Sequence, residues 1–466
     1  MLMNKAVMDA DVVVIGGGPG GLSAAETAAA GGLKTVMVEY AELGGTCLNR
    51  GCVPAKTWIS ATHLIKNIRR AAKIGVAKAY AGSDPGALGL DSERFSKLQS
   101  HMREVVGVLQ KGAVSNLKKA GVQVLGGKAE FLSKNEVGVN GAKGVVRFKR
   151  AVIATGSRPV ELFSKLPGFF DTDDVFGLTE WPLSVAVVGA GAAGVEMASF
   201  FNGAGCDVTV IEVMDDVLPF ADEEIRAVLK REFKKSGINL LLGAKVVNAQ
   251  SQSGRCVLEL EEGGSVKADV TIIAAGRKPN VGGLGLDKAG VSSDVWGNIN
   301  VDASMETSSG GIYAVGDVTG KSRLASTAHR EGIVAARNIL GTSDKMDYRV
   351  VPNIVFSDPE IACIGPTEDS LARTGAKIKV GRRHVRSLAR AQAGGEITGL
   401  FKVMVGKDNS ILAVHVTSPM ATEIIHGAAT AMAAGMKADA LADVVFGHPT
   451  YSEGIALAAA DAVGKK

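Results

Sequence analysis

A pattern that occurs twice along the chain constrains its fold most strongly: a buried strand, a glycine-rich turn, a helix, a second strand and a terminal acid. The first copy begins with the strand 11–15 and ends on Glu39, and the second begins with the strand 185–188 and ends on Glu212. In each copy the glycines follow a G-x-G-x-x-G spacing, which places a dinucleotide pyrophosphate at the N-terminus of the helix and a ribose beside the acid. The pattern therefore predicts an α/β protein with two Rossmann-like dinucleotide-binding domains. The six glycines are Gly16, Gly18 and Gly21 in the first copy and Gly189, Gly191 and Gly194 in the second.

The acid of the second copy also predicts which nucleotide binds there. A carboxylate such as that of Glu212 accepts a hydrogen bond from a ribose 2′-hydroxyl but repels a 2′-phosphate. Asp215 and Asp216 follow closely and add negative charge, and no arginine comes directly after them. The second site is therefore expected to prefer NAD over NADP.

Two cysteines five positions apart, Cys47 and Cys52, come shortly after the first nucleotide-binding pattern. The glycines around them, Gly44, Gly45 and Gly51, allow the backbone to pass close to a flat ligand. Because the chain shows no disulfide framework, an adjacent pair in a reducing compartment is more often catalytic than structural. Two unrelated buried thiols are the alternative. We expect a redox dithiol at this pair, and buried hydrophobic positions for Cys206, Cys256 and Cys363.

Length and charge exclude several other classes of protein. A chain of 466 residues exceeds the size of a single hydrophobic core, so about three domains are expected. The formal net charge of +4 comes from Lys and Arg interspersed with Asp and Glu, without the basic stripe of a nucleic-acid-binding protein. No uncharged apolar run reaches the ~18 residues of a membrane helix, and Met1–Ala10 has the features of neither a secretion signal nor an import signal. The sequence thus predicts a cytoplasmic protein that binds neither nucleic acid nor membrane.

The segment Gly44–Pro54 resembles the active-site disulfide segment of the class I pyridine-nucleotide:disulfide oxidoreductases, a family of flavoenzymes. The resemblance covers nearly the full chain, because segments similar to the two domain crossovers of the family follow in order at Ala154–Pro159 and Ala274–Asn280. It implies that FAD binds at the first nucleotide site and NAD at the second, and that the chain ends in an α+β dimerisation domain. The implied domains are an FAD-binding domain with the redox disulfide at 1–155, an NAD-binding domain at 156–276, a return to the FAD or central domain at 277–350, and an interface domain at 351–466.

The same resemblance implies roles for the residues of the disulfide segment. Cys47 is expected to exchange with the substrate, and Cys52 to contact the flavin. Lys56 is expected to lie by the flavin N5 and to pair with an acid of the NAD-binding domain, Glu196.

Other residues are implied to contact the cofactors directly. Asp317 ends a strand in the family pattern and is expected to hold the ribityl chain of FAD. A helix that opens at Leu324 and Ala325 is expected to direct the positive end of its dipole toward the N1 edge of the flavin. Further contacts are implied from Thr46, Thr155 and Gly156 to FAD and from Gly276 and Arg277 to NAD.

From about Val351 the sequence changes to alternating strands, at 401–405 and 411–416, followed by alanine-rich helices, which predicts an α+β domain. A His-Pro-Thr-x-x-Glu segment from His448 to Glu453 resembles the acid/base motif of the family. A thiol that reacts near neutral pH needs a group to take its proton, and imidazole titrates in that range. The resemblance implies that Glu453 fixes the tautomer of His448 and that His448 serves the flavin site of the partner subunit, so a homodimer is expected.

Together these features predict an FAD enzyme that transfers electrons from a protein-bound dihydrolipoyl dithiol through the Cys47/Cys52 pair to NAD. A lipoyl-carrying protein is then the expected partner, and no metal site is expected. Three positions depart from the family pattern: Ala55 stands where many relatives carry serine, and Ser326 and Phe446 stand where members that use this substrate often carry histidine. Two alternatives stay open: an NAD(P)H-dependent disulfide or metal-ion reductase of the same family, and a non-catalytic NAD-sensing flavoprotein subunit.

Overall fold

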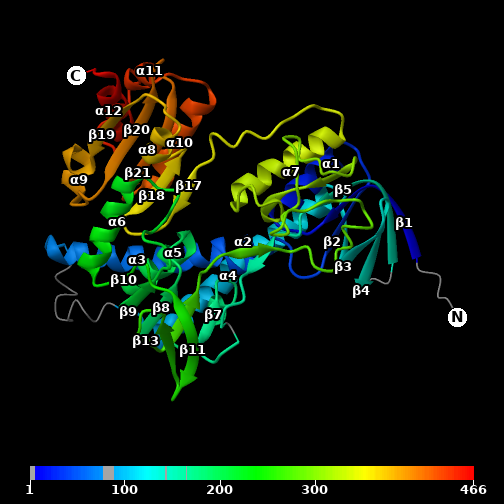
Figure 1. Cartoon of the computed structure of the whole chain (residues 1–466), viewed down its shortest axis with the longest axis horizontal. Helices are drawn as coiled ribbons and strands as arrows, with labels where there is room; N and C mark the ends of the chain where they lie inside the picture. Colours follow the sequence, from blue (N-terminus) through cyan, green and yellow to red (C-terminus); the bar gives the residue numbers. More distant parts are fainter. Residues whose placement is uncertain (1–5, 77–88, 142–143, 164, 466) are drawn as a thin grey trace.

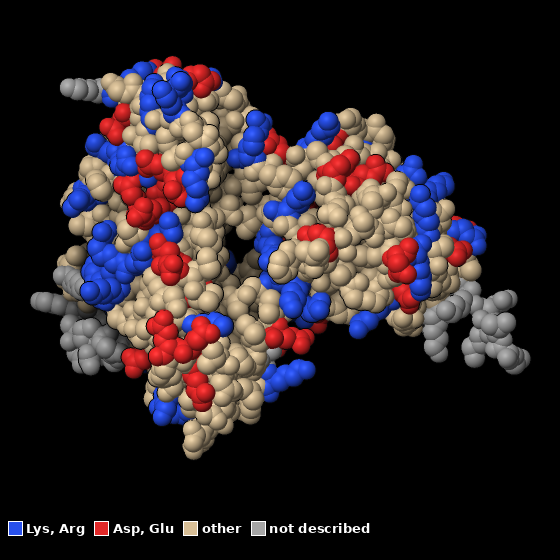
Figure 2. Space-filling model, viewed as in Figure 1, with Lys and Arg blue, Asp and Glu red and all other residues tan. Residues whose placement is uncertain are grey.

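The structure is a computed structural model that describes residues 6–76, 89–141, 144–163 and 165–465, and its chain forms three parts (Figure 1). Of the segment Met1–Ala10, considered above for targeting signals, residues 1–5 lie outside this description. Figure 2 shows acidic and basic side chains interspersed over one face, which is hollowed between the part that contains β1 and the other two parts. Within the described ranges, no helix has the length and apolar character needed to cross a bilayer.

The first nucleotide-binding pattern forms the centre of a six-stranded sheet. β1 pairs in parallel with β2 and β5, and β5 pairs in parallel with β16, which the chain adds after passing through the second part. Both faces of β1 are covered, because Val12 and Val14 pack with α1 and α7 while Val13 packs with β3 and β4. The elements are β1 (Ala6–Ile15), α1 (Pro19–Ala30), β2 (Thr35–Glu39), β3 (Gln123–Ser133), β4 (Glu136–Gly141), β5 (Gly144–Ile153), β16 (Ile312–Ala314) and α7 (Ala325–Ile339).

The second pattern forms a five-stranded sheet in which every pairing is parallel, in the order β10-β9-β8-β14-β7. A separate three-stranded antiparallel sheet, β11-β12-β13, lies beside it. The elements are β7 (Phe169–Asp171), β8 (Ser184–Val188), α5 (Ala192–Gly203), β9 (Asp207–Ile211), α6 (Glu223–Ser236), β10 (Asn239–Leu241), β11 (Val246–Gln252), β12 (Arg255–Leu260), β13 (Ser265–Ala268) and β14 (Val270–Ile273).

The two segments that resemble domain crossovers pair with each other. β6 (Ser157–Pro159) and β15 (Arg277–Pro279) form a two-stranded antiparallel ribbon, with Arg158 opposite Lys278. The chain therefore leaves the first sheet and returns to it at the same place.

The C-terminal part is a five-stranded antiparallel sheet, in the order β17-β18-β21-β20-β19, with helices packed on it. α12 lies very close to β19, since a Cβ atom on Gly381 would be 1.9 Å from the carbonyl oxygen of Ala458. Two parallel α/β units and one α+β unit agree with the predicted fold class. The elements are β17 (Asn353–Val355), β18 (Glu360–Ile364), α8 (Glu368–Arg373), β19 (Ile378–His384), α9 (Ala389–Gly394), β20 (Leu400–Gly406), β21 (Ile411–Ser418), α10 (Ala421–Ala433), α11 (Ala438–Ala442) and α12 (Glu453–Val463).

In the described residues between β2 and β3, the helices are α2 (Gly45–Arg50), α3 (Cys52–Lys73) and α4 (Ser92–Lys119). α3 runs between the second part and the C-terminal part (Figure 1). On one side Trp58 stacks on Phe200 of α5, with ring centroids 4.9 Å apart, and on the other Lys66 forms an ion pair of 2.6 Å with Asp358. This helix therefore links all three parts of the molecule directly behind the cysteine pair.

Candidate active site

The two predicted redox cysteines lie on consecutive helices that touch the phosphate-binding turn. Cys47 is on α2 and Cys52 is the first residue of α3, with Gly51 between the helices. Gly45 has a φ of 58°, and a Cβ atom on it would be 2.8 Å from the Cα of Gly18. Only a glycine fits there without displacing the turn, so the dithiol and the first nucleotide site are in backbone contact.

The surroundings of the two thiols make them unequal. A hydrogen bond with Cys47 lowers the pKa of Cys52 to about 7, and the positive charge of Lys56 acts in the same direction. The same bond, together with burial, raises the pKa of the Cys47 thiol. Cys52 also begins a long helix, where the dipole favours a thiolate. In the reduced pair, Cys52 is therefore the thiol that ionises first.

Lys56 is held at the junction of the three parts. Its Nζ lies 2.8 Å from Oε2 of Glu196 on α5 and 4.7 Å from the ring centroid of Phe356 in the C-terminal part. The carboxylate of Glu196 also accepts a hydrogen bond of 3.1 Å from the Phe356 amide. The expected pairing of Lys56 with Glu196 is thus present, one helical turn beyond Cys52.

The glycine turns of the two nucleotide units have the same geometry. In the first, Oε2 of Glu39 accepts a hydrogen bond of 2.6 Å from the Gly17 amide, and in the second, Oε2 of Glu212 accepts one of 2.5 Å from the Ala190 amide. A Cβ atom on the last glycine of either motif would lie 1.9 Å from the carbonyl oxygen of the first, so each helix packs tightly on its strand.

Both sites fit the dinucleotides that were predicted for them. In the described residues, neither α1 nor α5 has a side-chain cap at its N-terminus, so its first amide groups are available to a pyrophosphate. The hydroxyl of Thr155, just after β5, is buried and has no hydrogen-bond partner in the described part of the chain. A ligand hydroxyl or phosphate at the first site would satisfy it.

Asp317 does not end a strand, contrary to the expectation from the sequence. β16 ends at Ala314, because Gly316 has a φ of 76° and turns the chain into a short 3₁₀ helix, Gly316–Thr319, that contains Asp317. The Asp317 carboxylate accepts a hydrogen bond of 2.5 Å from the hydroxyl of Ser157 in β6. Asp317 therefore lies where the crossover ribbon meets the first sheet.

Arg277, which was predicted to contact NAD, lies in the same ribbon. Its guanidinium donates to Ser157 Oγ at 2.8 Å and forms an ion pair of 2.6 Å with Asp173. Its position connects Asp317, through Ser157, to the segment that directly follows β7 of the second sheet. Gly156 and Gly276 flank the ribbon with φ values of 68° and 105°.

Sequence reasoning missed a buried acid behind Asp317. Glu331 on α7 is fully buried, and its carboxylate accepts hydrogen bonds of 2.6 Å from the Gly316 amide and 2.7 Å from the hydroxyl of Tyr348. Burial raises the pKa of Glu331 to about 7 despite these bonds. The only sign of this buried acid in the sequence is that Glu331 is the one charged residue on an otherwise mostly apolar face of α7.

Glu331→Gln is expected to stabilise the protein above neutral pH. The folded-state pKa of about 7 exceeds the ordinary value of 4.5, so the stability contributed by this group is present below pH 4.5 and is lost as the pH rises through 7. The difference between the two pKa values corresponds to roughly 3 kcal/mol in the free energy of unfolding. Glutamine can keep hydrogen bonds to both Gly316 and Tyr348. Thermal unfolding at pH 5 and pH 8 measures this: the variant should show a smaller difference between the two midpoints than the wild type. An unchanged difference would show that Glu331 does not titrate in this range.

His448 and Glu453 form the predicted pair at the start of α12. Nδ1 of His448 lies 2.9 Å from Oε2 of Glu453. The other carboxylate oxygen of Glu453, Oε1, accepts a hydrogen bond of 2.7 Å from the Thr450 amide. Burial alone would raise the pKa of Glu453, but these bonds hold it below its usual value. The His448 side chain is 70% exposed, so Nε2 is free to meet another molecule.

Within one subunit, His448 is not brought to the thiols. In the described ranges, no hydrogen bond or ion pair joins it to α2 or α3, and α12 lies at the far edge of the C-terminal part (Figure 1).

The remaining predicted residues are at two helix starts: Thr46 lies at the start of α2, and Leu324 and Ala325 lie at the N-terminus of α7. Cys206, Cys256 and Cys363 are buried, as expected.

Two family models match the chain. Pyridine nucleotide-disulphide oxidoreductase matches residues 10–332, and the dimerisation domain of the same family matches residues 351–459. A dihydrolipoyl dehydrogenase of Thermus scotoductus is 37% identical over 470 residues, covering 98% of this chain and 98% of the relative. A dihydrolipoyl dehydrogenase of Chlamydia muridarum is 34% identical over 459 residues, covering 97% of this chain and 96% of the relative. The solved structure of the HOCl-induced flavoprotein disulfide reductase RclA from Escherichia coli has a TM-score of 0.83 at 26% identity, covering 96% of this chain and 98% of that one.

The chain belongs to the pyridine nucleotide-disulphide oxidoreductase family. It is a flavin disulfide oxidoreductase that uses FAD and NAD, and it carries the dimerisation domain of the family. The predicted family, fold class and cofactors are thereby confirmed. The roles of individual residues and the domain boundaries stay predictions.

Proposed function

We propose that the protein is a dihydrolipoyl dehydrogenase that acts as a homodimer on a lipoyl-carrying protein. The observation that carries the proposal is the position of the dithiol: α2 touches the first nucleotide turn at Gly18, while Lys56 reaches Glu196 beside the second nucleotide unit. The dithiol thus lies between the two nucleotide units. A cytoplasmic location stays a prediction.

In this proposal the oxidised enzyme holds Cys47 and Cys52 as a disulfide. A thiolate of the dihydrolipoyl group attacks Sγ of Cys47, the Cys47–Cys52 bond breaks, and Cys52 leaves as a thiolate. The second substrate sulfur then attacks the mixed disulfide, which releases Cys47 as a thiol and the substrate as a disulfide. Bound FAD supplies the transfer of the two electrons from the dithiol to NAD.

His448 accepts the proton of the attacking thiol. Glu453 holds Nδ1, so Nε2 is the acceptor, and the low pKa of Glu453 keeps it ionised opposite the imidazolium that forms. Because His448 contacts neither thiol of its own chain, we assign it to the thiols of the partner subunit. Intact thiols together with this pair disfavour the alternative of a non-catalytic subunit.

Comparing electron acceptors tests the proposed substrate. Purified enzyme should oxidise NADH rapidly with lipoamide and slowly with oxidised glutathione or mercuric ion. The similarity to RclA, and the residues Ala55, Ser326 and Phe446, make a different disulfide the main competitor. Rapid turnover with glutathione and none with lipoamide would refute the assignment.

Glu212→Gln should reduce the preference for NAD over NADP. Its carboxylate is fixed by the amides of Ala190 and Met214, at 2.5 and 2.8 Å, so it meets the ribose at a defined place. Repulsion of a 2′-phosphate by one such charge gives a preference of ~10-fold or more in the wild type. Steady-state kcat/KM with both nucleotides measures the ratio, and Glu261→Gln, on the exposed face near β12, is the matched control. Equal use of NAD and NADP by the wild type would contradict the role of Glu212.

A further inference from the structure

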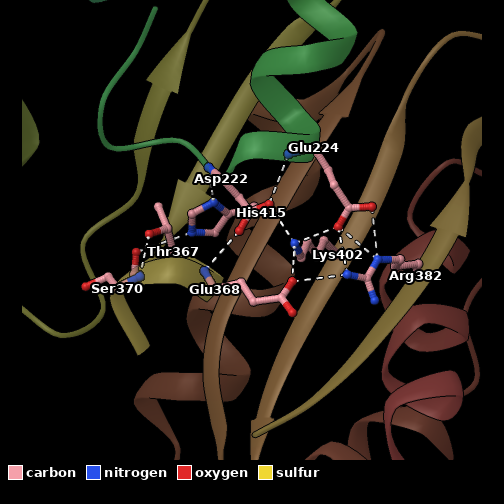
Figure 3. Close-up of polar contacts among 9 residues, drawn as sticks. Asp222, Glu224, Thr367, Glu368, Ser370, Arg382, Lys402 and His415 are labelled. Atoms are coloured by element: carbon pink, nitrogen blue, oxygen red, sulfur yellow. Dashed lines mark hydrogen bonds and ion pairs between the residues drawn. The ribbon is translucent and has the colours of Figure 1, made fainter. Parts of the chain in front are cut away.

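A charged cluster around the buried Lys402 joins the NAD-binding part to the C-terminal sheet and includes neither the thiols nor the residues of the glycine turns. Figure 3 shows side chains from β19, β20, β21 and α8 converging on the N-terminus of α6. The cluster consists of Lys402, Arg382, His415 and Glu368 from the C-terminal part and Asp222 and Glu224 from the NAD-binding part.

Lys402 is the centre of this cluster. Its side chain is only 2% exposed, and its Nζ lies 2.6 Å from carboxylate oxygens of Asp222, Glu224 and Glu368. Arg382 supplies a second positive charge, at 2.8 Å from Glu224. A buried ammonium is tolerated only when it is paired in this way, so the two parts are held in one relative position.

His415 fixes the backbone of the same junction. Burial lowers the pKa of His415 to about 4, so the ring is neutral at physiological pH. Its Nδ1 accepts a hydrogen bond of 3.0 Å from the Asp222 amide, and its Nε2 lies 3.3 Å from the carbonyl oxygen of Gly365. Both the main chain and the side chain of Asp222 are therefore held by the C-terminal sheet.

On the other side, Asp222 ends the loop that begins at the ribose acid Glu212. Within this loop Leu218 is fully buried and has a φ of 44°, a conformation that costs free energy in any residue with a side chain. The Leu218 amide donates a hydrogen bond of 3.1 Å to the carbonyl oxygen of Ala190, and the Ala190 amide donates to Glu212. The loop from Glu212 to Asp222 thus closes back on the second glycine turn while its far end is held by Lys402.

We propose that Lys402 and Asp222 are positioning residues for NAD: they hold the loop from Glu212 to Asp222 in the strained conformation that places Glu212 and the glycine turn for the nucleotide. Affinity for NAD then depends on residues of the C-terminal part that do not touch it. This inference rests on the proposed function only for the reaction that is assayed, because the use of NAD follows from membership of the family.

The test compares the two half-reactions of the holoenzyme dimer. Lys402→Met and Asp222→Asn should each raise the KM for NAD by ~10-fold, which corresponds to 1.4 kcal/mol, while kcat changes by less than about twofold. Reduction of the bound flavin by dihydrolipoamide, followed anaerobically without NAD, should keep the wild-type rate. Lys437→Met, which removes an exposed ion pair with Asp408 in the same part, is the matched control and should change none of these values.

Two results would overturn the inference. A lowered unfolding temperature with an unchanged KM for NAD would show that the cluster only stabilises the fold, and an equal loss in both half-reactions would show a general distortion. If Lys402→Met does not fold, Arg382→Gln at the rim of the cluster replaces it in the test. Its KM for NAD should rise by less than the ~10-fold expected for Lys402→Met. If wild-type enzyme does not reduce NAD with dihydrolipoamide, the proposed function fails, and the Kd of NADH for wild type and variants, measured by calorimetry, still tests the positioning role.

Discussion

Cys52→Ser enzyme should lose dihydrolipoamide oxidation by ~10³-fold or more, because no disulfide can form and the thiol that ionises first is gone. In the wild type, two-electron reduction should produce a long-wavelength absorbance band from the Cys52 thiolate beside oxidised FAD, since the pKa of Cys52 is about 7. Cys52→Ser should abolish this band, whereas Cys47→Ser should show it before any reductant is added, because its unpaired Cys52 thiolate lies beside oxidised FAD. Anaerobic titration with dithionite, followed by absorbance spectroscopy, measures the band.

The control is Cys256→Ser, which alters a buried cysteine of the NAD-binding part and should leave both rate and band unchanged. A band that survives in Cys52→Ser and disappears in Cys47→Ser would reverse the two assigned roles. The inequality of the two thiols would then have to come from the bound flavin rather than from Lys56 and the start of α3.

A mixed dimer of Cys47→Ser and His448→Ala chains should recover about half of the wild-type activity, although each parent homodimer is nearly inactive. The reason is geometric: His448 does not contact the thiols of its own chain, so in the proposed mechanism each site combines the thiols of one subunit with His448 of the other. A twofold dimer then contains one site with both defects and one with neither. Co-expression with two different affinity tags isolates the mixed species, and lipoamide-dependent NADH oxidation measures its activity.

A mixed dimer of Cys47→Ser with Cys47→Ser/His448→Ala chains is the control, and it should stay inactive because no intact thiol pair is present. If the first mixed dimer is as inactive as its parents, His448 acts on its own subunit or takes no part in the reaction.

The sequence predicted most of the fold because its strongest signals are local. A strand, a glycine turn and a helix follow one another within about twenty residues, and a missing Cβ at Gly21 or Gly194 is required by contacts inside the same unit. The strands at 401–405 and 411–416 likewise follow from a short-range pattern, whereas the helix that opens at Ala325 follows from the family resemblance. The dithiol was evident because two cysteines lie close together in the chain.

The residues that were missed make contacts over long sequence separations. Lys402 lies 180 positions from Asp222, and nothing in a strand of alternating residues indicates that its ammonium is buried among carboxylates. His415 lies 193 positions from Asp222, so its bond to the Asp222 amide could not be foreseen. The strand before Asp317 was drawn too long, because the left-handed turn at Gly316 depends on Glu331 and Tyr348, which come later in the chain.

The ribbon of β6 and β15 makes the NAD-binding part an insert whose two ends are hydrogen-bonded neighbours. Such an insert behaves as a cassette: recombination at two points near residues 159 and 277 can exchange it without cutting a strand of the sheet around β1. An enzyme of this family can therefore acquire a new nucleotide preference in one genetic event while keeping its thiols and its dimer. The exchange has requirements at a distance, since the incoming cassette must present acids at positions 196 and 222 to pair with Lys56 and Lys402.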